Sequence, residues 1–270
     1  MARLLGIAPL THLELTPPEM VANAAQAGYD FLGLRLIPAT PTEKHHFSLA
    51  EPSMMRETLQ RLQDTPLKVL DIEIFRLQPG TDVTTYEAAL AAGAMLGAKH
   101  ALAAPQDTDP TRLADLLARF CELASQYGLG VDLEPTPWYE VRTLGECQQV
   151  IALTGRLDIG IVLDMIHFDR AGETAQAIQA LPASYFRYAQ LCDAPKLRPI
   201  DTEGLLFQAR CERLMPGDGG LDLELARTLA GERRLQHLDA LRDQAGVPQA
   251  AVLIIEQDQF AVSGNAGDAA

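Results

Sequence analysis

Basic residues are scarce in this chain. Its 22 lysines and arginines are outnumbered by 36 aspartates and glutamates, which gives a formal net charge of −14. Nucleic acids and anionic membranes bind surfaces rich in lysine and arginine, so this deficit argues against either as the main partner. Long apolar runs are also absent: no stretch approaches about 18 uncharged apolar residues, which predicts that no segment spans a membrane.

Paired cysteine motifs are missing as well. The four cysteines, Cys121, Cys147, Cys192 and Cys211, are scattered and form neither a CxxC pair nor a zinc-finger spacing. We therefore expect reduced and mostly buried thiols. The opening segment MARLLGIAPLTHLEL lacks the apolar core and the small-residue cleavage site of a secretory signal. Together these absences predict a cytoplasmic location.

Strand-like and helix-like segments alternate along the 270 residues. The predicted strands cover residues 3–8, 30–37, 67–77, 99–104, 129–135, 158–164, 184–193 and 250–256. Helical patterns lie between them, at residues 20–27, 51–63, 84–96, 109–127, 144–153 and 173–181, and up to about residue 245. The first turn lacks the GxGxxG of a doubly wound dinucleotide-binding sheet. The sequence therefore predicts the α/β class and a (β/α)8 barrel, the TIM barrel.

We predict a single barrel domain over residues 1–260, followed by a disordered tail over 261–270. After Glu256 only 14 residues remain, without an amphipathic pattern, so the eighth outer helix is expected to be missing or replaced. The barrel wall between the last strand and the first must then be covered in another way. The segment before the last strand or a second subunit, and hence a homo-oligomer, are the alternatives.

Polar residues stand at the ends of several apolar strands. Four of them should converge where the carboxyl ends of the strands meet: Glu134, Asp164, Gln190 and Glu256. Three carboxylates brought together cannot all stay ionised without a compensating charge. A divalent cation supplies it, and oxygen donors suit Mn²⁺ or Mg²⁺, with Zn²⁺ or Co²⁺ as alternatives. We therefore predict one metal ion held by these four residues, against the alternative of an ordinary turn at Glu134 and a helix cap at Asp164.

Short motifs around these residues resemble the xylose isomerase-like sugar phosphate isomerase/epimerase superfamily. The matching segments are "DLEPTPW" with Glu134, "LDMIHF" with Asp164 and His167, "AQLCDAP" with Gln190 and Asp193, and "LIIEQD" with Glu256. "LDIEIF" with Glu73 matches an acid of the third strand, and "RCERLMPGDGGLDL" resembles the R-x-x-P-G-x-G loop of the family, with Arg213 as its arginine. The resemblance covers nearly the whole chain to Leu223, and its strength lies in the combination of motifs.

The resemblance implies a metal-dependent enzyme that acts on a small polyhydroxylated ketone or aldehyde through an enediolate. Glu134 and Glu256 would remove and return a proton at the substrate carbon, and His167 would hydrogen-bond a substrate oxygen. Many members of the family have histidine where this chain has Gln190. That difference resembles the branch of dehydratases acting on 3-dehydroshikimate or on inosose, so isomerisation or epimerisation and dehydration both stay open.

Further residues are candidates for contact with the substrate: Arg35, Glu73, Asp193, Arg213 and His12. Arg35 and Glu73 could equally form a buried ion pair with each other. Because a guanidinium matches a phosphate or a carboxylate, the loop at Arg213 is a candidate anion site, with a solvated loop as the alternative. The single tryptophan, Trp138, follows Glu134 closely and either lines the site or packs outside it.

Two other functions stay open from the sequence alone. An endonuclease IV-like barrel needs several histidine ligands and a basic surface, which the six histidines and the net charge of −14 disfavour. A non-catalytic carbohydrate-binding barrel would agree with the missing last helix. Such a binding protein need not hold a metal, and it would tolerate the loss of Glu134.

Overall fold

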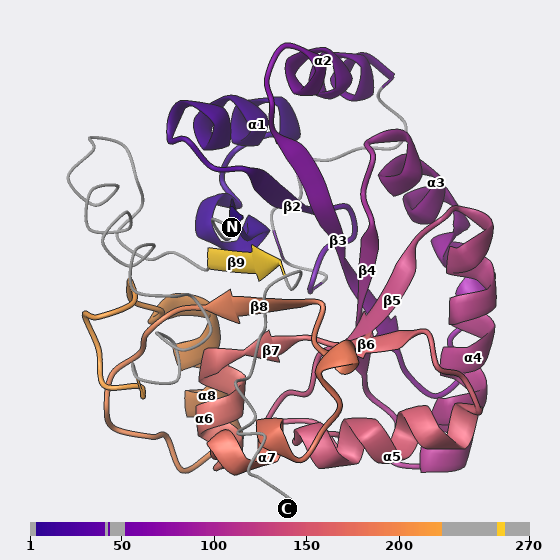
Figure 1. Cartoon of the computed structure of the whole chain (residues 1–270), viewed down its shortest axis with the longest axis vertical. Helices are drawn as coiled ribbons and strands as arrows, with labels where there is room; N and C mark the ends of the chain where they lie inside the picture. Colours follow the sequence, from indigo (N-terminus) through magenta and orange to yellow (C-terminus); the bar gives the residue numbers. More distant parts are fainter. Residues whose placement is uncertain (1–3, 41–42, 44–51, 223–252, 257–270) are drawn as a thin grey trace, which may run out of the picture.

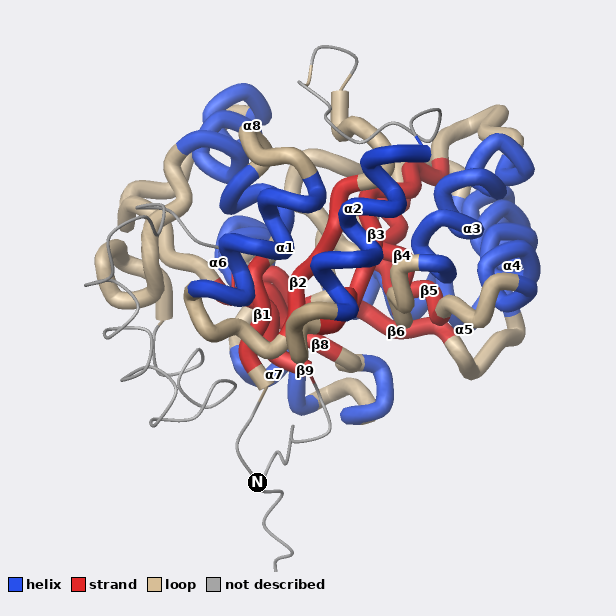
Figure 2. Tube along the Cα trace, turned by 90° about the horizontal axis from the view of Figure 1, so that it is seen from above, coloured by secondary structure: helices blue, strands red, loops and turns tan. Residues whose placement is uncertain are grey.

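Parallel strands and outer helices build a closed barrel in the computed structural model, which describes residues 4–40, 43, 52–222 and 253–256. Figure 2 shows the strands at the centre with the helices outside them. The strands are β1 (Leu5–Ile7), β2 (Phe31–Arg35), β3 (Lys68–Leu77), β4 (His100–Pro105), β5 (Gly130–Leu133), β6 (Ile159–Ile161), β7 (Leu163–Asp164), β8 (Tyr188–Leu191) and β9 (Leu253–Glu256). Their order in the sheet is β6-β5-β4-β3-β2-β1-β9-β8-β7.

The two ends of this strand order meet in a single extended segment. β6 and β7 are separated by Val162 alone, and β6 pairs with β5 while β7 pairs with β8. When β6 and β7 are counted as one strand, the sheet closes on itself with eight strands. The predicted (β/α)8 barrel of the α/β class is therefore confirmed. The tail over residues 261–270 and the eighth outer helix lie outside the described residues.

The last strand departs from the all-parallel pattern of such barrels. β9 pairs antiparallel with both β1 and β8, and Figure 1 shows the arrows of β8 and β9 pointing in opposite directions. Its register places the backbone of Glu256 opposite Tyr188, at the amino end of β8, while Leu253 lies opposite Leu191 at the carboxyl end. An antiparallel strand brings its amino end, not its carboxyl end, to the barrel mouth. The prediction that Glu256 converges there with Glu134, Asp164 and Gln190 is therefore wrong.

Local sequence signals mark the ends of several of the outer helices. They are α1 (Pro17–Gln26), α2 (Pro52–Gln63), α3 (Glu87–Met95), α4 (Pro110–Gln126), α5 (Leu144–Thr154), α6 (Met165–Ala171), α7 (Ala175–Gln179) and α8 (Thr202–Cys211). Thr16 and Glu19 form a capping box at α1, and the Asp109 side chain caps α4. The sequence did not predict α6 or α8. Among the described residues, no helix is long and apolar enough to cross a membrane.

Two polar layers lie one above the other inside the barrel. Side chains two residues apart on a strand face the same side, so Asp71, Asp132 and Tyr188 lie beneath Glu73, Glu134 and Gln190. The lower three are fully buried. The Tyr188 hydroxyl donates to Asp71 Oδ2 at 3.2 Å, and Asp132 Oδ2 lies 2.9 Å from His100 Nδ1. The upper layer of side chains thus packs on a lower layer of buried polar side chains.

The carboxyl group of Asp71, in the lower layer, makes the stability of the folded protein depend on pH. Burial, followed by the charge of Glu73, raises its pKa well above 3.8, so the folded protein retains a proton that the unfolded chain loses. Stability is therefore greatest below the unfolded pKa and falls as pH rises toward the folded pKa. We expect Asp71→Asn to raise the melting temperature by a few degrees at pH 8 and to change it little at pH 4. Thermal denaturation at both pH values tests this, with Asp115→Asn on the exposed face of α4 as control; equal effects at both pH values would contradict it.

Candidate metal and substrate site

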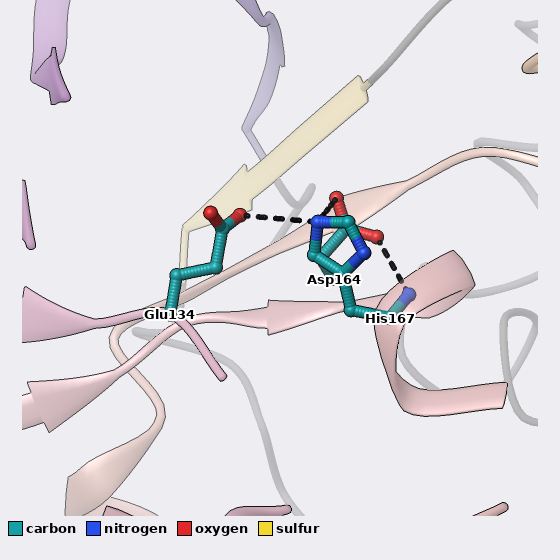
Figure 3. A group of neighbouring side chains, drawn as sticks. All are labelled: Glu134, Asp164 and His167. Atoms are coloured by element: carbon teal, nitrogen blue, oxygen red, sulfur yellow. Dashed lines mark hydrogen bonds and ion pairs between the residues drawn. The ribbon is translucent and has the colours of Figure 1, made fainter. Parts of the chain in front are cut away.

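Three buried side chains meet at the carboxyl end of the barrel. Glu134 follows β5, Asp164 ends β7, and His167 lies in the first turn of α6. One candidate ligand atom from each lies within 4.8 Å of the other two. His167 Nε2 is 3.9 Å from both Glu134 Oε1 and Asp164 Oδ2. Figure 3 shows the three side chains turned toward one another. The strand ends therefore converge as the sequence predicts for Glu134 and Asp164, and they bring His167 with them.

Each oxygen of the Asp164 carboxylate has its own partners. Its Oδ1 accepts hydrogen bonds from the backbone amides of Ile166 at 2.9 Å and His167 at 3.3 Å, so the residue caps α6. Its Oδ2 lies 2.9 Å from a guanidinium nitrogen of Arg213. Because Oδ1 caps the helix, the orientation of the carboxylate is fixed and its Oδ2 faces the site. The helix-cap interpretation and the site interpretation of Asp164 are thus compatible.

The electrostatics of the three residues differ. Burial, then the charges of Asp164 and Glu73, raise the pKa of Glu134 well above 4.5. Burial alone would raise the pKa of Asp164 too, but Arg213 and His167 lower it below its ordinary value. Burial lowers the pKa of His167 to about 4, so its imidazole is neutral at neutral pH and offers a lone pair. Glu134 is thus the acid whose charge lacks compensation.

Gln190 supplies a fourth polar group beside this cluster. It pairs with Asp164 in the register of β7 and β8, and its side chain is buried and lines the same cavity as Glu134. Its amide nitrogen has no hydrogen-bond partner among the described residues. Carboxylate, imidazole and amide donors suit a divalent ion, and an ion would compensate the charge of Glu134. The residues present therefore fit a divalent metal.

A cavity of about 300 Å³ opens beside the cluster. The ionisable side chains that line it are Arg35, Glu43, Glu73, Arg76, Glu134, His167, Arg210 and Arg213. Arg35 forms ion pairs with Glu73 at 2.9 Å and with Glu43 at 3.1 Å. Arg35 and Glu73 therefore form the ion pair that was one of their two alternatives, and both also line the cavity. The candidate metal ligands Glu134 and His167 therefore share one cavity with several charged side chains.

Two of the predicted substrate contacts have other surroundings. The Asp193 carboxylate accepts hydrogen bonds from the backbone amides of Ala194, Gly217, Gly219 and Leu221 at 2.8 to 3.0 Å. A Cβ at Gly219 would lie 2.4 Å from Asp193 Oδ1, so only glycine allows this approach. Asp193 therefore holds the R-x-x-P-G-x-G loop in place and is not among the residues that line the cavity.

His12 is the other such residue. It is fully buried, does not line the cavity, and neither ring nitrogen has a hydrogen-bond partner among the described residues. Burial lowers its pKa to about 4, so the ring is neutral at neutral pH. In this structure His12 packs as a neutral ring within the first turn of the barrel, in the short 3-10 helix Pro9–His12.

The cavity lining includes residues that the sequence did not assign to the site, among them Thr136 and Arg76, and it also includes Trp138, for which the sequence left two alternatives open. Trp138 packs edge-on against His167, with 4.8 Å between the ring centroids, which decides between its two alternatives in favour of the site. Thr136 and Trp138 could have been found because they follow Glu134 at a strand end. Arg76 could not, because the pairing of β3 with β4 shifts register between Ile72 and Phe75, and such a shift changes which side chains face the interior.

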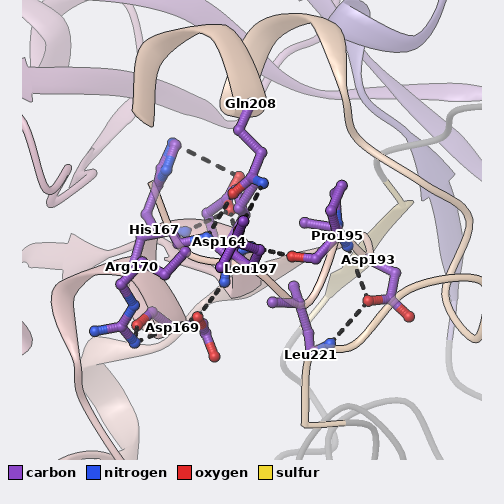
Figure 4. Close-up of polar contacts among 12 residues, drawn as sticks. Asp164, His167, Asp169, Arg170, Asp193, Pro195, Leu197, Gln208 and Leu221 are labelled. Carbon is purple, nitrogen blue, oxygen red and sulfur yellow. Dashed lines mark hydrogen bonds and ion pairs between the residues drawn. The ribbon is translucent and has the colours of Figure 1, made fainter. Parts of the chain in front are cut away.

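A network behind the cluster joins α6 to α8. Figure 4 shows these contacts. Arg170 Nε donates to Gln208 Oε1 at 2.6 Å, and another nitrogen of Arg170 donates to the Pro195 carbonyl at 2.7 Å. Gln208 Nε2 donates in turn to the Leu197 carbonyl at 3.2 Å. Because His167 and Arg213 are carried by the segments that this network joins, it helps to fix the positions of both.

A (β/α)8 barrel with carboxylates and a histidine gathered at the carboxyl ends of its strands is the class of protein that this fold and site define. The chain belongs to the xylose isomerase-like TIM barrel family, since the model of that family matches residues 21–234. The resemblance seen in the sequence motifs is thereby confirmed.

Similar proteins include enzymes with different names. The inosose isomerase of Halalkalibacterium halodurans is 24% identical over 220 residues, which cover 76% of this chain and 75% of that protein. The 3-dehydroshikimate dehydratase of Pseudomonas aeruginosa is 29% identical over 116 residues, 43% of this chain and 18% of that protein. The crystal structure of the IOLI protein with a binding zinc atom matches with a TM-score of 0.62 at 19% identity, covering 87% of this chain and 84% of the other. This structural likeness shows the fold.

Proposed function

We propose that the protein is a divalent-metal-dependent isomerase or epimerase of a small keto-polyol, acting through an enediolate. The observation that carries the proposal is the buried cluster of Glu134, Asp164 and His167 beside a cavity whose lining includes several charged side chains. The names of the relatives, among them an inosose isomerase, and the zinc atom of the IOLI structure support it. A purely carbohydrate-binding barrel would have no need of such a cluster.

Glu134, Asp164, His167 and Gln190 would hold the ion. When bound, a divalent ion polarises a substrate carbonyl and so lowers the cost of removing the neighbouring proton. A carboxylate has two oxygens, so Glu134 would give one to the ion and use the other to take the proton. Its raised pKa brings it closer to neutrality, where a general base is most effective.

Glu73 would return the proton in place of Glu256. It is buried, lines the cavity together with Glu134, and is oriented by its 2.9 Å ion pair with Arg35. Thr136 and Trp138 each have a buried polar atom without a hydrogen-bond partner among the described residues, and both line the cavity. A buried polar group without a partner is costly, and hydroxyl groups of a polyol would satisfy both.

Dehydration is the second candidate. Gln190 at the fourth ligand position favours it, and so does the similarity to a 3-dehydroshikimate dehydratase. Both reactions begin with removal of the same proton. They differ in whether that proton returns to carbon or a β-hydroxyl group leaves.

Metal analysis of the purified protein tests the shared part of both candidates. We expect about one divalent ion per chain, a higher melting temperature on addition of Mn²⁺ or Mg²⁺, and loss of both effects in Asp164→Ala and Gln190→Ala. Asp115→Ala, on the exposed face of α4, is the matched control and should retain the ion. A protein that holds no ion and shows no thermal shift would overturn the proposed function.

A further inference from the structure

Four arginines line the cavity, and two of them have carboxylate partners. Arg35 is paired with Glu43 and Glu73, and Arg213 with Asp164. Arg76 and Arg210 have no carboxylate within ion-pairing distance among the described residues. Among the described residues that line the cavity, the remaining acid is Glu134, which a divalent ion would neutralise. The described part of the lining therefore has two guanidinium groups without a carboxylate partner, in a chain whose net charge is −14.

The two unpaired arginines differ in how well they are positioned. Arg210 lies on α8 and is exposed, so solvent screens its charge. Arg76 is half-buried at the carboxyl end of β3. One of its guanidinium nitrogens donates to the Pro38 carbonyl at 3.3 Å, and its own backbone carbonyl accepts the Tyr86 hydroxyl at 2.8 Å. Because these contacts hold both the backbone and the guanidinium group of Arg76, its side chain is oriented before a ligand binds.

A guanidinium in this position is suited to an anion. It has five N–H donors, and the contact with Pro38 uses one nitrogen only. Carboxylate and phosphate both accept paired hydrogen bonds from the remaining donors. The neutral hydroxyl groups of an uncharged substrate would leave the positive charge of the half-buried Arg76 without a compensating negative charge.

We infer that Arg76 binds an anionic substituent of the substrate, a carboxylate or a phosphate, on the side of the cavity formed by the end of β3. This inference rests on the proposed function and narrows its substrate to an anionic keto-polyol. A carboxylated cyclic keto-polyol such as 3-dehydroshikimate belongs to this class, whereas the neutral inososes do not. The residue would decide specificity and would take no part in the proton transfer.

Ligand pairs that differ only in charge test this inference. We would measure dissociation constants by calorimetry with Mn²⁺ present for 3-dehydroshikimate and its methyl ester, and for a ketopentose phosphate and the free ketopentose. We expect the wild-type protein to prefer the anionic member of one pair, and Arg76→Gln to weaken that member about 10- to 100-fold without affecting the neutral one. Preference within the first pair identifies a carboxylate, and preference within the second a phosphate.

Three variants separate positioning from general charge. Arg76→Lys should bind the anionic ligand more tightly than Arg76→Gln does but less tightly than the wild type. Lysine keeps the positive charge, but it lacks the paired N–H donors of a guanidinium group. Arg210→Gln, which removes an exposed charge from the same cavity, and Arg119→Gln, on the exposed face of α4, should change affinity less than about threefold. Equal binding of both members of each pair by the wild type, or equal weakening of both members in Arg76→Gln, would overturn the inference.

Turnover distinguishes this inference from the proposed function. If the anionic ligand binds through Arg76 but no metal-dependent reaction of any keto-polyol is found, the proposed function fails and the anion site stands. If neutral inosose is converted in a metal-dependent reaction but the wild type prefers the anionic member of neither pair, the reaction stands and the anion site is rejected.

Discussion

Replacing Glu134 by glutamine is expected to lower kcat by about 10²- to 10⁴-fold, the usual contribution of a positioned general base. The amide keeps an oxygen that can face the ion, the role proposed for Gln190, but it cannot take a proton at neutral pH. The variant should therefore still hold the ion while losing turnover. Steady-state kinetics together with metal analysis measure the two effects separately.

Stability supplies the internal control for Glu134→Gln. Because burial and the charges of Asp164 and Glu73 raise the pKa of Glu134, the ionised form opposes folding at neutral pH. A neutral amide should thus leave the apo protein at least as stable as the wild type at pH 8. Glu140→Gln, at an exposed acid in the same loop, should change neither stability nor turnover. Full activity in Glu134→Gln would remove this residue from the proton transfer.

Replacing Arg213 by glutamine should destabilise the apo protein by about 3–5 kcal/mol, the usual result of breaking a buried ion pair. Both members are buried, and the guanidinium lies 2.9 Å from Asp164 Oδ2. Without Arg213, Asp164 would keep a buried charge whose compensation is lost, since Arg213 is the main cause of its low pKa after the opposing effect of burial. We expect a melting temperature lower by on the order of 10 °C.

A double-mutant cycle tests this explanation. Asp164→Asn in the Arg213→Gln background should recover most of the lost stability, because no unpaired charge remains. Added Mn²⁺ should also stabilise Arg213→Gln, since an ion bound to Asp164 would replace the guanidinium charge. Arg210→Gln, an exposed arginine one turn earlier, is the matched control. If its effect on stability equals that of Arg213→Gln, the ion pair with Asp164 contributes little.

Much of the site could be predicted because parallel strands end at the same edge of a barrel. Each strand is short and apolar, so the first polar residue after it is visible in the sequence. Glu134 directly follows β5, Asp164 ends β7 and Gln190 lies near the end of β8, and the structure brings all three to the mouth. His167 comes with them, because Asp164 caps the short helix that carries it.

By itself, the sequence determined the alternation of strands and helices, the helix start at Asp109, and the strand-end acids, since these depend on periodicity and on neighbours a few residues away. Only the tertiary structure decided which distant groups meet. The antiparallel direction of β9, the pairing of Arg213 with Asp164, and the register shift that accompanies Arg76 in the cavity are such cases. Each is decided by the free energy of contacts between segments far apart in the chain. Such contacts leave no local pattern in the sequence.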